Sequence, residues 1–264
     1  MHKTRLYILF LGLFLGSSAS AQLPQQQEPP FEPGEKLHYK IRYGFISAAN
    51  GTLSVNKSSR DFQGKDAWHL KAEGKTVSAV ALFMKVRNKY NSYISTQSLK
   101  PFLFTESVKE GDYTRDSYVR FDRKNGVVNT NKGVFDINKD ALDVLSAFYY
   151  ARSLDVSKLN SGESIKLYYF IDDEQYSMVI KYLGKETIKT SFGRMECLKF
   201  TPSLIEGRIF RDDSDMYLWI TNDANRIPVK AKVEILVGSL TLELEDYENL
   251  KYPLGTSMAQ TVAP

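Results

Sequence analysis

The chain has 264 residues, of which 12% are aromatic, and its formal net charge is +4. The 16 Tyr and 15 Phe supply a hydrophobic core, and the single cysteine excludes an internal disulfide. The small net charge, spread along the chain, does not favour nucleic acid as a partner.

Residues 1–21 are predicted to be a secretory signal peptide. Two basic residues precede an apolar run at 6–16, which is too short to span a membrane as an ordinary helix. Ala19 and Ala21 are the small residues expected before a cleavage site. An N-terminal membrane anchor is the alternative. Cleavage would leave 33 basic against 31 acidic residues. The mature protein is expected to be exported and periplasmic, or alternatively secreted or associated with the outer membrane, and not to be an integral membrane protein.

The rest of the chain is expected to form one domain. Residues 22–34 are rich in Gln and Pro, which predicts a flexible leader. Residues 250–264 are predicted to be a polar tail. The segment between them, 35–249, has the size of a single β-rich domain.

Strands are predicted wherever apolar and polar residues alternate. The first is clear, because Leu37, Tyr39, Ile41 and Tyr43 alternate with basic residues. Residues 76–84 are ambiguous, with some apolar residues at helical spacing. The strands of the first half are predicted at 35–45, 52–56, 66–74, 86–95, 102–109, 113–121 and 126–130.

The one clear helix is predicted over residues 138–152. Asn138 is the candidate N-cap, and Asp140 and Asp143 lie near the positive end of the helix dipole. Apolar residues occur on more than one side, so we expect the helix to pack along a sheet.

The second half is again predicted to be β. Its strands are expected at 163–170, 174–183, 186–190, 195–203, 205–211 and 215–221, followed by a closing meander over 227–245. Two stretches repeat earlier ones: residues 34–39 resemble 162–167, and 91–101 resemble 217–228 when one inserted residue is allowed. We therefore predict an all-β fold, a strongly curved antiparallel sheet or open barrel of two similar halves joined by the helix. The alternative is that β-strand sequences simply look alike.

No pattern of residues encodes a reaction. His38 and His69 lie on polar strand faces without metal-ligand spacing, and no nucleotide-binding loop or nucleophile elbow is present. The Asp172 and Asp173 pair is expected to lie in a solvated turn. Cys197, within a strand-like run, is expected to be a buried structural thiol. We therefore expect no catalytic residue, no metal and no cofactor.

Aromatic residues on the predicted inward faces are the candidates for an apolar groove. A curved sheet can enclose more volume than its own side chains fill. The candidate lining residues are Tyr39, Tyr43, Trp68, Phe102, Phe104, Tyr149, Tyr169, Tyr176 and Trp219. A polar spot on the helix is a second candidate, formed by Asp143, Ser146 and Arg152. Hydrogen bonds that pin the helix to the sheet are its structural alternative.

Four segments make the sequence resemble a known family, the exported bacterial proteins of domain of unknown function 3108. They are GEKLHYKIRYG with AANG (34–44 and 48–51), YISTQSLKP (93–101), DVLSAFYYAR (143–152) and LWITNDANRIPV (218–229). The resemblance implies export, the Gram-negative envelope and a β-rich fold, and it carries no activity. By architecture alone, the predicted fold also resembles periplasmic lipoprotein carriers.

These observations lead us to expect a non-catalytic binding protein for a lipid or another apolar molecule. The first alternative is a structural or protein-interaction component of the envelope, with an envelope protein as partner. The second is an enzyme acting on polysaccharide, which would need carboxylates converging on a cleft.

Overall fold

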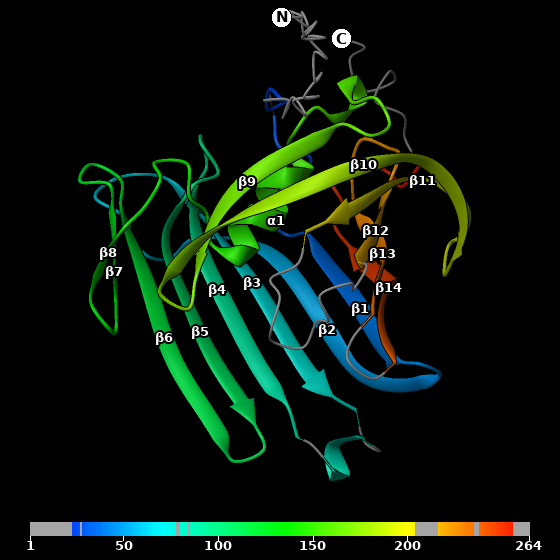
Figure 1. Cartoon of the computed structure of the whole chain (residues 1–264), viewed down its shortest axis with the longest axis horizontal. Helices are drawn as coiled ribbons and strands as arrows, with labels where there is room; N and C mark the ends of the chain where they lie inside the picture. The colour runs from blue at the N-terminus through cyan, green and yellow to red at the C-terminus, as the bar shows by residue number, and fades with distance from the viewer. Residues whose placement is uncertain are drawn as a thin grey trace, which may run out of the picture.

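The computed structural model describes residues 23–26, 28–77, 80–83, 85–203, 216–234 and 238–255. These residues form one antiparallel sheet of 14 strands with a single α-helix on its concave side (Figure 1). The predicted all-β, strongly curved open sheet is confirmed. The predicted signal peptide and the strand expected at 205–211 lie outside the described residues.

The first half of the chain is a meander of eight strands. They are β1 (Lys36–Tyr43), β2 (Ile46–Lys57), β3 (Ala67–Thr76), β4 (Arg87–Ser95), β5 (Pro101–Glu110), β6 (Tyr113–Asp122), β7 (Val127–Thr130) and β8 (Val134–Asp136). A short 3₁₀ helix, η1 (Val80–Leu82), lies in the connection between β3 and β4, where the sequence pattern was ambiguous.

The second half is a meander of six strands that follows the helix α1 (Val144–Arg152) and a 3₁₀ turn, η2 (Val156–Lys158). Its strands are β9 (Ser164–Ile171), β10 (Glu174–Thr190), β11 (Gly193–Pro202), β12 (Met216–Thr221), β13 (Pro228–Glu234) and β14 (Ser239–Glu248). All neighbours in the sheet follow each other in sequence except β1 and β14, which join the two meanders.

The helix is shorter than predicted, because residues 138–142 are not helical. Leu142 instead binds the edge of β9, donating its N–H to Tyr168 and accepting from Phe170, both at 2.8 Å. The N-cap is therefore Asp143, not Asn138. Its side chain accepts from two backbone N–H groups, one of them that of Ser146, and the Ser146 hydroxyl accepts from the Asp143 N–H, which completes a capping box.

Hydrogen bonds show that the two halves begin in the same way. Gly34 donates its N–H to the carbonyl of Val55, and Val55 donates back to the residue after Gly34. Gly162 and Tyr182 make the same two bonds at the start of the second half. Both glycines have positive φ, +116° and +97°, which an L side chain adopts only with strain. β1 thus corresponds to β9, and β2 to β10.

A second match lies in the corners that join the fourth and fifth strands of each half. Leu99 and Arg226 both have φ near +50°, at +56° and +50°, and each stands two residues before a proline, Pro101 or Pro228. In both corners the strand register shifts by one residue at the proline pair. The same strand order and the same local geometry make the two halves similar.

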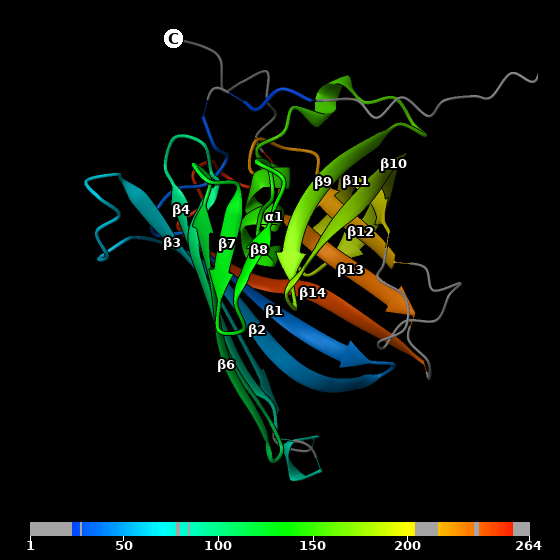
Figure 2. The same cartoon turned by 60° about the vertical axis from the view of Figure 1, so that its left-hand side comes forward.

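This correspondence identifies the pair of strands that would have to join for the sheet to close. By analogy with the paired β14 and β1, strand β6 would pair with β9. Strand β7 instead covers residues 119–122 of β6, and Leu142 covers the edge of β9. An open seam is left between β6 and β9, which is visible beside the β7–β8 hairpin in Figure 2.

The turn between β9 and β10 spans this seam. Asp172 and Asp173 both have positive φ, which two-residue hairpin turns require and Asp tolerates. Asp172 pairs with Arg115 of β6 at 3.0 Å, and Asp173 pairs with Lys132 at 2.7 Å. The expected turn between two strands is present and partly exposed, and its two carboxylates also hold the second half against the first.

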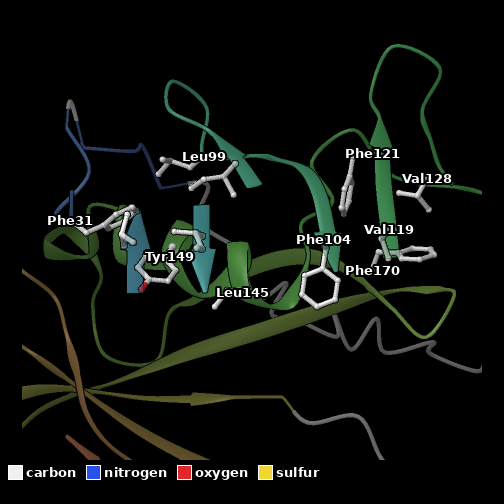
Figure 3. Close-up of a cluster of buried hydrophobic side chains, with 12 residues drawn as sticks. Phe31, Leu99, Phe104, Val119, Phe121, Val128, Leu145, Tyr149 and Phe170 are labelled. Atoms are coloured by element: carbon white, nitrogen blue, oxygen red, sulfur yellow. The ribbon is translucent and has the colours of Figure 1, made fainter. Parts of the chain in front are cut away.

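Parts of both terminal segments belong to the core. Phe31, in the segment expected to be a flexible leader, is fully buried and packs edge-on against Trp68 and Tyr149. In the segment expected to be a polar tail, Gly255 donates its N–H to Asp223 at 2.9 Å. Figure 3 shows Phe31 and Tyr149 at one end of the cluster that also contains Phe104.

The helix ends at a buried ion pair. Arg152 makes two hydrogen bonds to the carboxylate of Glu35, at 2.6 and 2.9 Å, and a third to the carbonyl of Asn225 at 3.1 Å. Its guanidinium lies 5.1 Å from the ring of Phe31. Burial alone would lower the pKa of Arg152, but the charge and hydrogen bonds of Glu35 raise it. Arg152 therefore stays charged and connects the chain start, the helix and the second corner.

Loss of this pair should strongly destabilise the fold. Arg152→Met leaves the Glu35 carboxylate buried without a partner, so we expect the free energy of unfolding to fall by about 3–5 kcal/mol. Urea denaturation measures the change. Lys36→Met is the control, because the Lys36–Glu248 pair is exposed and is worth about 1 kcal/mol or less. Equal losses for the two variants would contradict the assigned role of Arg152.

Candidate functional site

The concave face of the sheet can be followed from the pairing register. Ser92 of β4 donates a 2.6 Å hydrogen bond to the helix cap Asp143, so its face of the sheet is the helix side. Residues opposite one another in adjacent strands share a face, as do residues two apart in one strand. Leu53, Ala72 and Tyr90, which pair in sequence across β2, β3 and β4, therefore also face the helix side.

The same face continues across the junction of the two halves. Ile41 of β1 pairs with Leu242 of β14, which pairs with Ala231 of β13, which pairs with Leu218 of β12. Together with Leu240, these partly exposed apolar residues are called the apolar band. It consists of Ile41, Leu53, Ala72, Tyr90, Leu218, Ala231, Leu240 and Leu242.

The helix covers one part of this face, and the apolar band borders that part. Val55 and Leu70, nearer the helix, are fully buried in its cluster, whereas Leu53 and Ala72, two residues away on the same strands, are only partly covered. Val144 and Phe148 of α1 are half-buried against the same cluster. The side chains of this face offer apolar contact surface and few hydrogen-bonding groups.

Polar residues lie next to one end of the apolar band, beside Tyr90. Tyr90 pairs across the sheet with Glu106, which pairs with Ser117. Glu106 accepts a 2.7 Å hydrogen bond from Ser117 and lies 2.8 Å from Arg115. A cavity of about 60 Å³ lies beside them at the open seam, between Phe104 and Phe170. Its volume suits about two water molecules, not an organic ligand.

The predicted groove-lining aromatics are dispersed by the fold. Tyr149, Tyr39, Phe104, Tyr169 and Trp219 are buried.

The remaining four aromatics keep some exposure, in different places. Tyr43 lies at the end of β1, and Trp68 packs on Phe31. Phe102 stacks on Phe62 at 5.0 Å, in a cluster with Tyr93 on the face opposite Ser92.

Tyr176 and Trp219, also among the nine predicted lining residues, contact other side chains. Tyr176 lies 5.9 Å from the ring of Tyr169. Trp219 faces Lys199, whose ammonium lies 5.2 Å from its ring. Trp219 therefore does not belong to the apolar band.

The helix residues predicted as a polar spot lie at opposite ends of α1. Asp143 and Ser146 form the N-terminal cap, and Arg152 forms the ion pair at the other end. All three side chains are buried, and burial raises the pKa of Asp143. Their hydrogen bonds pin the helix to β4 and to Glu35, which is the arrangement that the structural alternative predicts.

The remaining titratable candidates are engaged in local contacts. His38 lies 3.1 Å from Glu248, and His69 lies 3.0 Å from Asn91 and stacks on Tyr93. Burial lowers the pKa of His69. In the part of the chain that the structure describes, no three His, Cys, Asp or Glu side chains gather as a metal site.

The alternation pattern places Ile41, Leu53 and Ala72 of the apolar band on inward strand faces, but they were not among the predicted site residues. Large aromatics were chosen because they offer more apolar surface. The same property draws them into the core, where they contact the helix. Smaller residues such as Ala72 and Ile41 remain open. The missing information was the position of the helix over the sheet.

Comparison with models of protein families assigns the chain to a family. The model of "Protein of unknown function (DUF3108)" matches residues 38–245. The chain belongs to this family. The sequence resemblance to DUF3108 is thereby confirmed. No curated protein matches the sequence significantly.

Several solved structures are similar to this chain at low sequence identity. A β-barrel-like protein of domain of unknown function DUF1849 from Brucella abortus is 8% identical, with a TM-score of 0.55 over 83% of this chain and 98% of that one. A putative exported protein with a YmcC-like fold from Bacteroides fragilis is 12% identical, with a TM-score of 0.36 over 84% and 99%. A putative lipoprotein from Parabacteroides distasonis is also 12% identical, with a TM-score of 0.37 over 84% and 100%. The first supports the β-barrel-like architecture of this DUF3108 chain.

Among the described residues of this DUF3108 protein, no helix is both long and apolar enough to cross a bilayer.

Cys197 should be unreactive in the folded protein. It is fully buried, and burial, with Asp223 and Glu186 nearby, raises the pKa of its thiol to about 11. The thiolate is the nucleophile, so a disulfide reagent at mildly alkaline pH should modify Cys197 only after denaturation. Ser59→Cys adds an exposed thiol as the positive control. Native Cys197 reacting as fast as that thiol would refute the expectation.

Proposed function

We propose that this DUF3108 protein is an exported, non-catalytic binding protein for a lipid-like molecule, which lies along the apolar band. The observation that carries the proposal is a row of apolar side chains left partly exposed on a concave face. Small-molecule sites are typically concave and mostly apolar. Monomeric proteins rarely leave such a surface uncovered without use.

The energetics of the apolar band suit an alkyl chain. Each methylene removed from water contributes about 0.8 kcal/mol, so about ten of them contribute on the order of 8 kcal/mol before the cost of immobilisation. Leu53, Ile41 and Leu242 offer aliphatic contacts, and Ala72 leaves room beside them because of its small side chain.

The polar end of the apolar band suits the head of an amphipathic ligand. Glu106, Ser117 and Arg115 lie next to Tyr90 in the sheet and at the open seam. A ligand whose chain follows the apolar band would place its polar end near these groups. Hydrogen bonds at one end fix orientation, while the chain supplies affinity.

Export is part of the proposal and rests on the N-terminal sequence. The basic start, the short apolar run and the small residues at 19–21 are typical of a secretory signal. An envelope location would bring the protein into contact with lipids.

Extraction of the purified protein tests the function. The chain would be expressed with its own N-terminus in a Gram-negative host, purified from the periplasm without detergent, and extracted with organic solvent for mass spectrometry. We expect a lipid at near-stoichiometric amount. A clean extract, together with no binding of a fluorescent fatty acid, would favour the protein-interaction role instead.

A paired substitution on β3 localises the binding. Ala72→Asp puts a charge into the apolar band, and Ala67→Asp makes the same change on the opposite face of the same strand. Desolvating a carboxylate opposes apolar binding, so we expect Ala72→Asp to weaken fatty-acid binding by about tenfold or more, a change of 1.4 kcal/mol. Ala67→Asp should stay within about twofold. Equal effects would place the ligand elsewhere.

A further inference from the structure

Four large apolar side chains project into solvent from two turns at one end of the first meander. Phe45 and Ile46, in the turn between β1 and β2, are 102% and 58% exposed. Leu82 and Phe83, at the end of η1 between β3 and β4, are 84% and 93% exposed. We call these four residues the apolar rim; it shares no residue with the apolar band.

Hydrogen bonds place the two turns at the same end of the sheet. Val77, which precedes η1, donates its N–H to the carbonyl of Ala48 in β2, at 3.0 Å. Thr76 pairs with Ala49 in the same two strands. Figure 1 shows η1 at the lower edge below the ends of β3 and β4, and the β1–β2 turn to its right and higher, both away from α1.

The apolar rim is a protrusion and not a groove. Singly exposed apolar residues are ordinary, but neighbouring turns that each carry two large ones are not. A partner protein would need pockets to receive these tips. A lipid bilayer receives them without preformed pockets, because its acyl region is fluid.

The backbone at the tip is suited to a non-aqueous surface. Ala81 donates its N–H to Val77 at 2.9 Å, and Phe83 donates to Val80 at 3.0 Å. These two satisfied N–H groups lower the cost of entering the bilayer interface, since the hydrocarbon supplies no hydrogen-bond partners.

The base of the apolar rim is cationic. Lys75, Lys85, Arg87 and Lys89 are exposed around the η1 turn, and the sequence has no Asp or Glu between residues 74 and 105. One carboxylate of the neighbouring strand lies there too: Glu110 is bridged to Val86 and accepts a 2.8 Å hydrogen bond from Asn88, so the four cations exceed the nearby acids without being alone. Of the four, Lys89 lies 3.6 Å from Glu73 of the neighbouring strand. Apolar residues at a tip with cations behind them are the pattern by which proteins bind anionic membrane surfaces.

We propose that the apolar rim docks this protein on the surface of an anionic lipid bilayer. Phe45, Leu82 and Phe83 enter the boundary between headgroups and acyl chains, and Lys85 and Arg87 lie against the phosphates. The docking holds the first meander end-on to the bilayer. It does not depend on a ligand in the apolar band.

Sedimentation with vesicles tests the docking. The full mature chain would be mixed with vesicles of phosphatidylethanolamine and phosphatidylglycerol, or of phosphatidylcholine alone. We expect wild-type protein to bind the anionic vesicles at least about tenfold more tightly, with binding that weakens as salt is added. Lys85→Gln with Arg87→Gln should remove most of this preference.

The apolar contribution is tested by a triple substitution, Phe45→Ser, Leu82→Ser and Phe83→Ser, which should reduce vesicle binding by about tenfold or more. Val134→Ser with Val179→Ser is the control, because these residues are also exposed, at 62% and 40%, but lie on β8 and β10. The control should bind as the wild type does. Since all of these positions are exposed, the substitutions leave the core unchanged.

Insertion itself is followed with Phe83→Trp. Its fluorescence should shift to shorter wavelength with anionic vesicles and be quenched by brominated acyl chains. Absence of vesicle binding by the wild type, or equal binding by wild type and triple variant, would overturn the proposal. So would rim-dependent capture of a protein with no vesicle binding. Ala72→Asp should still bind vesicles, which separates failure here from failure of the ligand-binding proposal.

Discussion

The buried ion pair between Arg152 and Glu35 connects the parts of the chain on which the rest of the structure depends. Arg152 is the last residue of the helix, Glu35 immediately precedes the first strand, and the carbonyl of Asn225 belongs to the second corner. At the other end, Asp143 is bonded to Ser92 of β4. The helix is thus held at both ends. A buried charge without its partner is costly, so these contacts specify one position of the helix over the sheet.

That position divides the concave face. Where α1 and Phe31 cover it, the side chains form a packed aromatic core. Beyond the helix the same face continues with aliphatic side chains that nothing in the described residues fully covers. The apolar band is therefore a consequence of helix length, because a nine-residue helix spans only about 13 Å.

The similarity of the two halves explains how they join on one side of the sheet, and their difference explains why the other side stays open. Corresponding glycines and prolines build the same hairpin start and the same corner twice, and pairing of β14 with β1 joins the halves on one side. On the other side, β7 and Leu142 take the hydrogen bonds that closure would need. Ion pairs of Asp172 and Asp173 hold this seam, and the polar end of the apolar band lies beside it. The proposed ligand site, the apolar band, thus lies on the concave face, and the proposed membrane contact, the apolar rim, lies on turns at one end of the first meander.

The amino-acid sequence by itself determined most of the strands, the single helix, the repeated corners and the family, because these follow from local alternation and from turn residues with special φ. It missed the short β8 and divided the continuous β10 into two strands. It also placed Ile41, Leu53 and Ala72 on an inward face. Only the tertiary structure decided which inward residues stay open, since covering depends on where α1 lies. It showed that Asn138 does not cap the helix, because Leu142 is bound to β9, and that Phe31 belongs to the core. It also brought Arg152 to Glu35 across 117 residues of chain. No local pattern encodes a contact of that separation.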